Sequence, residues 1–181
     1  MATAQGRDPV LQHREVVPLA EGPNNVDLLG WARPGLVTKG LFNNHNAHSF
    51  DYIVFYVSYP DSESGHPRWD VVPFITDSRR DLGFSTHQGA DCVLRDLRIL
   101  KPLAPPPTAV VVVVAERDMG DSYADSQPVN FSIYQLRTNT TMLPGEPGIY
   151  FERTRVIRSG RAYCDVEEAF RKELGLGSGA R

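Results

Sequence analysis

The chain has 181 residues, of which 41% are hydrophobic and 23% are charged, as in an ordinary globular protein. This length favours one domain with its own hydrophobic core and excludes collagen-like and disordered classes. Lys and Arg total 19 against 22 Asp and Glu, a net charge of -3, so the broad positive field of nucleic-acid-binding proteins is missing. The longest apolar run, 109–115, is much shorter than the roughly 20 residues that a membrane-spanning helix needs.

The first ten residues contain no apolar segment of the kind found in signal peptides. This fits a cytoplasmic protein, and it also fits a periplasmic or secreted protein whose leader has been removed. Both alternatives remain open. We expect a single β-rich domain at 14–175, with flexible segments at 1–13 and 176–181.

Segments rich in Val, Ile, Phe and Tyr, separated by Gly and Pro, predict strands joined by turns. In chain order the predicted strands are 14–19, 26–31, 36–42, 50–59, 69–76, 82–85, 92–100, 109–115, 127–136 and 148–157. The fold class is therefore mainly β, an antiparallel sandwich or flattened barrel of about 8–10 strands with one C-terminal α-helix.

Two of these strands, 50–59 and 109–115, are apolar or aromatic on both faces, and the second contains five consecutive valines. Such strands are typical of a sheet centre that is covered on two sides. Segment 127–136 instead alternates apolar and polar residues, which predicts one buried face. Pro73 cannot donate a ladder hydrogen bond, so 69–76 should be an edge strand or contain a bulge.

The segment from Asp165 to Leu174 predicts the helix. Asp165 can cap its first turn, with Glu168 three residues later completing a capping box. Val166, Phe170 and Leu174 share one face at helical spacing, so this face should pack against the sheet.

The two cysteines, Cys92 and Cys164, each begin a predicted element and neither lies in a C-x-x-C motif. One alternative is a disulfide, which would pin the helix to the strand that begins at Cys92. The other is a pair of buried free thiols that act as small hydrophobic side chains.

The segment 43–49 is rich in Asn and His, and His45 and His48 could bind one metal ion together with Asp51. Zinc sites need three or four ligands, and no H-x-H, H-E-x-x-H or Cys-rich set completes this one. The alternative is a loop whose amide side chains bond the local backbone.

A second candidate metal site is the acidic connection that contains Asp118, Asp121 and Asp125. The EF-hand spacing is absent, so only an irregular calcium loop could form here. The alternative is a set of turn-forming and solvated carboxylates, one of which pairs with Arg117.

Ser85, His87 and Asp91 are the residue types of an acyl-transfer triad. Three members within seven residues of a strand and turn seldom converge in space, and His87 stands where a G-x-S-x-G motif needs glycine. The alternative is a polar turn between strands.

Arg153 and Arg155 point the same way from one predicted strand and could bind an anionic ligand. The alternative is that they pair with carboxylates on neighbouring strands.

Several strings together resemble one family: 43–50 (NNHNAHSF), 90–98 (ADCVLRDLR) and 163–170 (YCDVEEAF), with 115–118 and 122–125. The chain is similar, over about residues 40–175, to proteins of intrinsic resistance (self-immunity) to carbapenem antibiotics in bacteria. The resemblance implies a small exported protein that acts in the periplasm and protects against a β-lactam without being a β-lactamase. No mechanistic motif carries over with it.

The sequence lacks the motifs that the known routes of β-lactam hydrolysis require. A serine enzyme needs S-x-x-K, and no Ser stands three residues before Lys39, Lys101 or Lys172. A zinc enzyme needs a histidine cluster, and no two histidines are two residues apart.

The leading hypothesis is a non-catalytic, soluble binding or protection module without a cofactor, which recognises a small molecule or a protein partner and contributes to carbapenem tolerance. One alternative is a hydrolase or metal-dependent enzyme that uses His45 and His48, or Ser85 and His87. Another is a structural or assembly protein, such as a homo-oligomer that associates through an exposed strand.

Overall fold

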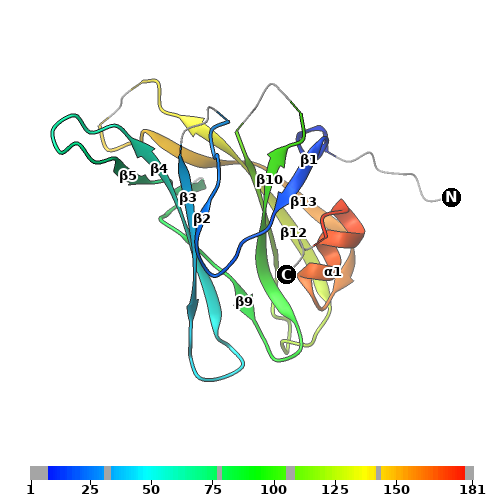
Figure 1. The fold of residues 1–181 in the computed structure, drawn as a ribbon. Helices are drawn as coiled ribbons and strands as arrows, with labels where there is room; N and C mark the ends of the chain where they lie inside the picture. Colours follow the sequence, from blue (N-terminus) through cyan, green and yellow to red (C-terminus); the bar gives the residue numbers. More distant parts are fainter. Residues whose placement is uncertain (1–7, 31–33, 77–78, 105–108, 142–143, 178–181) are drawn as a thin grey trace.

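The computed structural model describes residues 8–30, 34–76, 79–104, 109–141 and 144–177 (Figure 1). Within these residues thirteen strands form two facing sheets, with one short helix near the C-terminal end. The predicted mainly β, sandwich-like fold is confirmed, and the described strands do not close into a barrel. No helix of the described residues is long and apolar enough to cross a membrane.

The larger sheet, sheet A, has seven strands in one path and an eighth beside it. Their order is β1 (Arg14–Val17), β10 (Val93–Pro102), β11 (Val111–Arg117), β12 (Gln127–Thr138), β13 (Ile149–Tyr163), β6 (Phe74–Thr76) and β7 (Arg79–Asp81), with β9 (His87–Gln88) against β10. Neighbours are antiparallel except β13 and β6, which run parallel.

The smaller sheet, sheet B, is antiparallel throughout and packs against one face of sheet A. Its order is β2 (Gly22–Asn25), β3 (Gly35–Phe42), β4 (Phe50–Tyr59) and β5 (Arg68–Val71), with β8 (Phe84–Ser85) also paired to β4. The chain crosses from sheet B to sheet A at Val72 and Pro73, because the predicted strand 69–76 divides there into β5 and β6.

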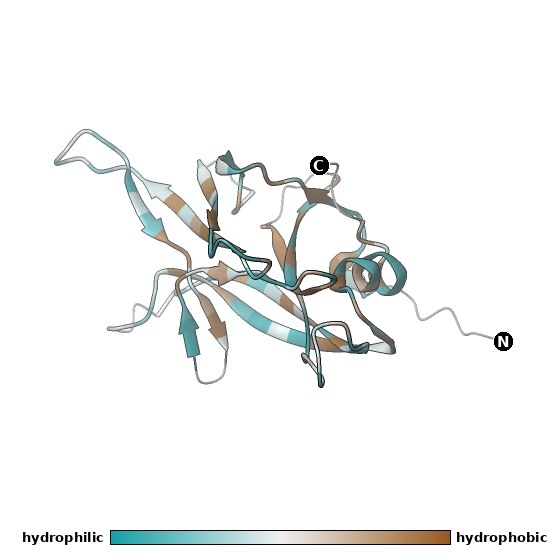
Figure 2. Cartoon of the chain, turned by 90° about the horizontal axis from the view of Figure 1, so that it is seen from below, coloured by the Kyte–Doolittle hydropathy of each residue, from teal (hydrophilic) through white to brown (hydrophobic). Residues whose placement is uncertain are grey.

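The valines of β11 serve two hydrophobic cores at once. Val112 and Val114 belong to the core between the sheets, whereas Val111 and Val113 belong to a second core on the opposite face of sheet A. This second core lies under the C-terminal helix and includes Phe131. The predicted two-sided burial of this strand is therefore confirmed. Figure 2 shows hydrophobic (brown) residues interspersed with hydrophilic (teal) ones along several strands of the fold.

Strand β4 is central in sheet B, as predicted, but the expectation that it is covered on both faces is wrong. Phe55 is fully buried between the sheets, whereas Tyr52 on the other face is 45% exposed. No described element packs over that face of β4 in the way that the helix packs over sheet A.

The strand predicted at 26–31 is also wrong over its described residues, 26–30. Val26 donates a backbone hydrogen bond to the carbonyl of Gly35 (3.0 Å), and the carbonyl of Leu28 accepts one from Val110 (2.9 Å). Apolar residues here belong to a buried connection between the sheets, and the strand lies before it at Gly22–Asn25.

The C-terminal helix consists of α1 (Val166–Ala169) and a π-helical turn, η2 (Phe170–Leu174). The side chain of Asp165 accepts a hydrogen bond from the backbone N–H of Glu167 (2.7 Å), as expected for an N-cap. Val166 and Phe170 are fully buried against sheet A.

A disulfide joins Cys92 to Cys164, with their Cα atoms 5.7 Å apart. It ties the residue before β10 to the loop before the helix, at positions 72 residues apart in the chain. Of the two alternatives that the sequence left open, the structure contains the bridge.

Both ends of the described chain take part in the packing. A 3-10 turn, η1 (Pro9–Leu11), places Leu11 in the second core, and Leu176 is buried there after the helix. Residues 1–7 and 178–181 of the segments predicted to be flexible lie outside the described residues.

Candidate functional site

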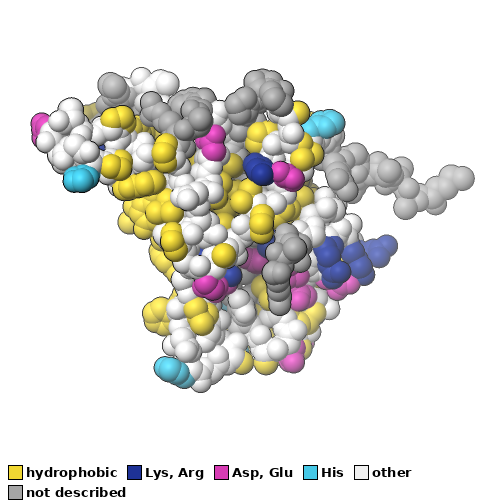
Figure 3. Space-filling model, viewed as in Figure 1, with side chains coloured by type: hydrophobic (Ala, Val, Ile, Leu, Met, Phe, Trp, Pro, Cys, Tyr) yellow, Lys and Arg dark blue, Asp and Glu magenta, His cyan; other side chains and the backbone are white. Residues whose placement is uncertain are grey.

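A cavity of about 460 Å³ lies at the edge of β10 between its partners β1 and β9, and it reaches from the space between the two sheets to α1 on the other face of sheet A. Its walls come from β1 and β10 of sheet A, from β3 and β4 of sheet B, and from α1. The lining contains apolar side chains such as Leu19 and Leu97, and six charged ones: Glu21, Lys39, Asp51, Asp96, Arg98 and Glu167. Figure 3 shows acidic and basic side chains gathered in the middle of the face that it presents.

The first charged group of the cavity is centred on Lys39. Its Nζ lies 2.9 Å from Glu21 Oε1 and 3.1 Å from Asp51 Oδ2. Burial on its own lowers the pKa of Lys39, but the hydrogen bonds and charges of the two carboxylates outweigh this, so the pKa is raised. Lys39 therefore stays protonated and bridges the segment before β2 to β4.

The second charged group is centred on Arg98. Its Nη1 donates to Asp96 Oδ2 (2.7 Å), its Nη2 donates to Glu167, and the guanidinium stacks over the ring of Phe170 at 4.8 Å. Only 9% of the Arg98 side chain is exposed. This network joins β10 to α1 at the cavity wall, and removing one partner would leave a charge buried without its counter-ion.

Asp96 and Glu167 share the same guanidinium and also contact each other. Burial, and after it a hydrogen bond with Glu167, raise the pKa of Asp96, Arg98 opposes both effects, and the net result is a pKa of about 7. A carboxyl group of the cavity therefore exchanges its proton near neutral pH, which is the range where acid and base chemistry or a pH-sensitive contact can operate.

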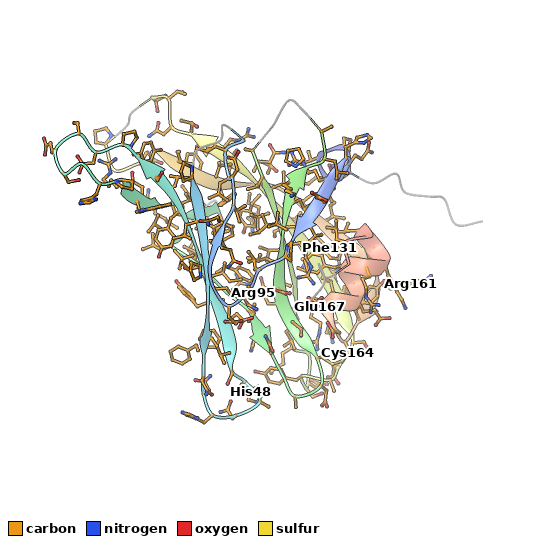
Figure 4. The ribbon with its side chains drawn as sticks, viewed as in Figure 1. His48, Arg95, Phe131, Arg161, Cys164 and Glu167 are labelled. Carbon is orange, nitrogen blue, oxygen red and sulfur yellow. A yellow bond between two sulfur atoms is a disulfide. The ribbon has the colours of Figure 1, made fainter. Side chains whose placement is uncertain are left out.

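A third cation, Arg95, lies between the sheets beside this cavity. Its guanidinium stacks over the ring of Phe84 at 4.3 Å, and its Nη1 donates to the carbonyl of Ser85 (3.2 Å) and to the hydroxyl of the same residue (3.4 Å). Arg95 thus links β10 to β8. Figure 4 labels both Arg95 and Glu167 near the middle of the view.

The predicted triad of Ser85, His87 and Asp91 is not assembled in the described residues. Ser85 interacts with Arg95, whereas His87 Nε2 lies 3.1 Å from the hydroxyl of Tyr123. The hydroxyl therefore faces a permanent cation in place of a proton acceptor.

The predicted histidine site is divided in the same way. The ring of His48 contacts that of Tyr123 in a tilted arrangement, with centroids 4.8 Å apart, so Tyr123 lies between His48 and His87 and joins the β3–β4 loop to β9. His45 is exposed in the β3–β4 loop, and Asp51 pairs with Lys39. Within the described residues no group of three or more His, Cys, Asp or Glu side chains could hold a metal ion.

The acidic connection between β11 and β12 has a structural role for at least one of its carboxylates. Asp125 accepts hydrogen bonds from the Ser122 hydroxyl (3.0 Å) and from the backbone N–H groups of Ser122 (2.9 Å) and Asp121 (2.8 Å), which lower its pKa. The expected pairing of Arg117 with a carboxylate is wrong. Arg117 is buried and donates to the backbone carbonyls of Cys164 (2.6 Å), Asp118 (2.6 Å) and Tyr123.

The predicted anion-binding arginines do not line the cavity. Arg155 pairs with Asp8 (2.7 Å), which lies before the first turn and not on a neighbouring strand. Arg153 lies opposite Tyr134 in the β12–β13 register.

No motif in the sequence marked Lys39, Asp96, Arg98 or Glu167 as a site residue. A signal was present, because Asp96 and Arg98 are charged residues within a predicted strand that is otherwise largely apolar. Their partner Glu167 lies 69 residues away from Arg98, so the cluster appears only once the helix is docked on sheet A.

No protein-family model matches the chain. No curated protein matches it either. Among solved structures, CarG aligns with a TM-score of 0.70 and 21% sequence identity, over 87% of this chain and 94% of CarG. The chain shares the fold of CarG. At this identity the likeness concerns the fold alone.

Proposed function

We propose that this protein is a non-catalytic binding protein that contributes to carbapenem tolerance without hydrolysing the drug. Two observations support a carbapenem-related role: the resemblance of segments such as 43–50 and 163–170 to carbapenem self-immunity proteins, and the fold shared with CarG. The observation that carries the non-catalytic part is the placement of Ser85 against Arg95.

Acyl transfer by a serine needs a neighbouring base that accepts the hydroxyl proton. The guanidinium of Arg95 cannot do so, because it carries its charge at all physiological pH values. His87, the nearest base in the sequence, is engaged with Tyr123. The described residues thus hold the candidate nucleophile and base on separate partners.

The cavity is the contact site that this proposal favours. It combines apolar walls with two cations and four carboxylates that are fixed by ion pairs. Such an arrangement suits recognition, since its polar groups are already oriented before a small molecule or protein partner arrives. The disulfide between Cys92 and Cys164 supports action in an oxidising compartment such as the periplasm.

The catalytic and binding hypotheses are separated by incubating purified protein with imipenem and following the ultraviolet absorbance of the β-lactam ring. The proposal expects the absorbance to stay at the level of a protein-free control. In parallel, the chain is exported to the periplasm of a carbapenem-sensitive bacterium, where it should raise the inhibitory concentration of imipenem. Ser85→Ala and His87→Ala should protect as well as the native chain.

The role of the cavity is tested with Lys39→Met, which should lose protection while remaining folded. Lys172→Met is the matched control, because Lys172 also forms an ion pair but lies on the helix surface, away from the cavity. Ring opening in proportion to protein concentration, abolished by Ser85→Ala or His87→Ala, would overturn the proposal. Full protection by a folded Lys39→Met variant would overturn the assignment of the cavity as the contact site.

A further inference from the structure

The cavity between β1 and β9 contains more carboxylates than cations. Each of its two charged groups has one cation between two carboxylates: Lys39 with Glu21 and Asp51, and Arg98 with Asp96 and Glu167. All six residues line the same cavity. With every carboxylate ionised, the lining carries four negative charges against two positive ones, so it attracts a positively charged ligand group.

The Arg98 group holds a proton in place of a second cation. Asp96 accepts hydrogen bonds from Arg98 Nη1 at Oδ2 (2.7 Å) and from the backbone N–H of Leu97 at Oδ1 (2.7 Å), and its carboxyl group also shares a hydrogen bond with Glu167. Two carboxyl groups form a hydrogen bond only when one of them is protonated, because ionised carboxylates are acceptors alone. The raised pKa of Asp96, about 7, agrees with this arrangement.

The other charged residues described around this carboxyl pair are engaged elsewhere. Lys39 of sheet B is held by its own two carboxylates, and Arg95 of β10 lies 3.6 Å from Glu116. β1 and β9 contribute only uncharged residues to the lining, and Ala115 of β11 lies opposite Asp96. A second positive charge for the pair is therefore expected from a ligand.

Arg98 adds a hydrogen-bond donor that lacks an acceptor. Only 9% of its side chain is exposed, and its Nε is buried with no hydrogen-bond partner among the described residues. A buried donor of this kind costs free energy until an oxygen meets it. The cavity wall thus favours a ligand that carries an acceptor oxygen together with a positive charge. Leu19 and Leu97 suit the apolar part of the same molecule.

From this charge balance we propose that the cavity binds the positively charged arm, an amine or an amidine, of a carbapenem, and that this arm displaces the proton shared by Asp96 and Glu167. The positive charge of the ligand enters as the proton leaves to the solvent, so the charge of the cavity is unchanged. The carboxylate and carbonyl oxygens of the carbapenem nucleus supply acceptors for Arg98. The inference rests on the proposed function, because it names the ligand chemistry of the same cavity.

The test compares two carbapenems that share a nucleus and differ in the charge of the arm. Imipenem has a formamidinium arm, whereas the arm of N-acetylthienamycin ends in a neutral acetamide. In isothermal titration calorimetry at pH 8, imipenem should bind at least about tenfold more tightly, since hydrogen bonds between charged partners are the stronger ones.

Imipenem binding should also depend on pH. Because the shared proton must leave, the affinity for imipenem should rise about tenfold between pH 6 and pH 8, on either side of the pKa of about 7 of Asp96. Binding should release up to about one proton, measured from the heats in two buffers of different ionisation enthalpy. N-acetylthienamycin displaces no proton, so its affinity should stay constant.

Asp96→Asn tests the carboxyl pair directly, because the amide keeps the shape of the side chain and cannot exchange a proton. It should lower the affinity for imipenem to the level of N-acetylthienamycin and remove the dependence on pH. Asp118→Asn is the matched control, since Asp118 is exposed and lies outside the cavity lining, and it should bind like the native chain. Thermal unfolding identifies a variant that fails to fold, and Glu167→Gln then replaces it.

Equal affinity for the two carbapenems, or imipenem binding that is independent of pH, would overturn this inference and leave the proposed function intact. Native affinity for imipenem in folded Asp96→Asn and Glu167→Gln would do the same. If neither carbapenem binds, the inference is overturned together with direct recognition of the drug, and the protection of exported cells then decides separately whether the role in tolerance stands.

Discussion

The two sheets of this molecule differ in how many of their faces are buried. Sheet A is covered twice: Val112 lies in the core between the sheets, and Val113 lies under the C-terminal helix. Sheet B is covered once, with Phe55 buried inside and Tyr52 exposed outside. The core between the sheets stabilises both of them, whereas the second core adds to sheet A alone, so substitutions on the exposed face of sheet B should change stability less than substitutions on either face of sheet A.

The largest effect should come from the second core. Phe131→Ala removes a fully buried ring that contacts Phe170 of the helix, with centroids 5.7 Å apart. We expect a loss of about 3–5 kcal/mol in the free energy of unfolding, because the deletion leaves a cavity that the sheet cannot close. Denaturant titration at low protein concentration measures it. A loss below 1 kcal/mol would contradict two-sided burial of sheet A.

The disulfide also stabilises the helix-covered side of sheet A. Replacing Cys92 and Cys164 together with Ala should lower the free energy of unfolding by about 2–4 kcal/mol, because the unfolded chain regains the freedom of a long closed loop. The free energy of unfolding of the native protein is measured with and without a reductant. The reductant should lower it for the native protein and leave it unchanged for the double variant. Equal stability of native and variant proteins would show that the helix is held without the bridge.

The buried carboxyl pair predicts a dependence on pH. The pKa of Asp96 is raised from 3.8 to about 7, so the folded state binds a proton more tightly than the unfolded state does. Its contribution to stability is complete below about pH 4 and is lost as the pH rises towards 7. Relative to the native protein, Asp96→Asn should therefore gain on the order of 4 kcal/mol between these limits and level off above them.

The measurement for Asp96→Asn is the difference in unfolding free energy between variant and native protein at a series of pH values. Asp118→Asn serves as a comparison, because Asp118 is an exposed carboxylate outside the cavity lining, and its difference from the native protein should stay constant over this pH range. A difference for Asp96→Asn that stays constant from pH 4 to 7 would show that its carboxyl group does not take up the proton.

The smallest effects on stability should come from replacing a valine with threonine, once in each sheet. Val113→Thr buries a hydroxyl in the second core and should cost about 1–3 kcal/mol, since valine 113 is fully buried. Val71→Thr, on the face of sheet B that points away from sheet A, keeps its hydroxyl in water and should change stability by less than about 0.5 kcal/mol. Chemical denaturation of both variants gives the comparison. Equal costs would contradict the one-sided burial of sheet B.

Periodicity predicted the parts of the fold in which local pattern and burial agree. The limits of β4 match its apolar run, and the five valines around β11 indicate a strand buried on both faces. The strand β2 was missed because its sequence, Gly-Pro-Asn-Asn, is typical of turns; it is held by pairing with β3. The segment 26–30 was misassigned because its apolar residues fill the space between the sheets without a ladder.

The candidate site was beyond reach of the same reasoning. Local motifs drew attention to Ser85 and the histidines, which the fold separates, whereas Arg98 and Glu167 meet only through the packing of the helix on sheet A. The spacing of Arg98 and Glu167 along the chain does not predict their contact, because neither residue belongs to a motif. The charged positions within β10 were the available clue.

Arg117 binds the backbone of the neighbouring segments and not their side chains. All the hydrogen bonds described for its guanidinium go to main-chain carbonyls, including those of Asp118, Met119 and Tyr123. A loop held by its backbone tolerates changes of residue type wherever the carbonyls keep their direction. Substitutions at the exposed tip around Met119, whether by evolution or by engineering, should therefore change the surface of this protein without changing the fold beneath it.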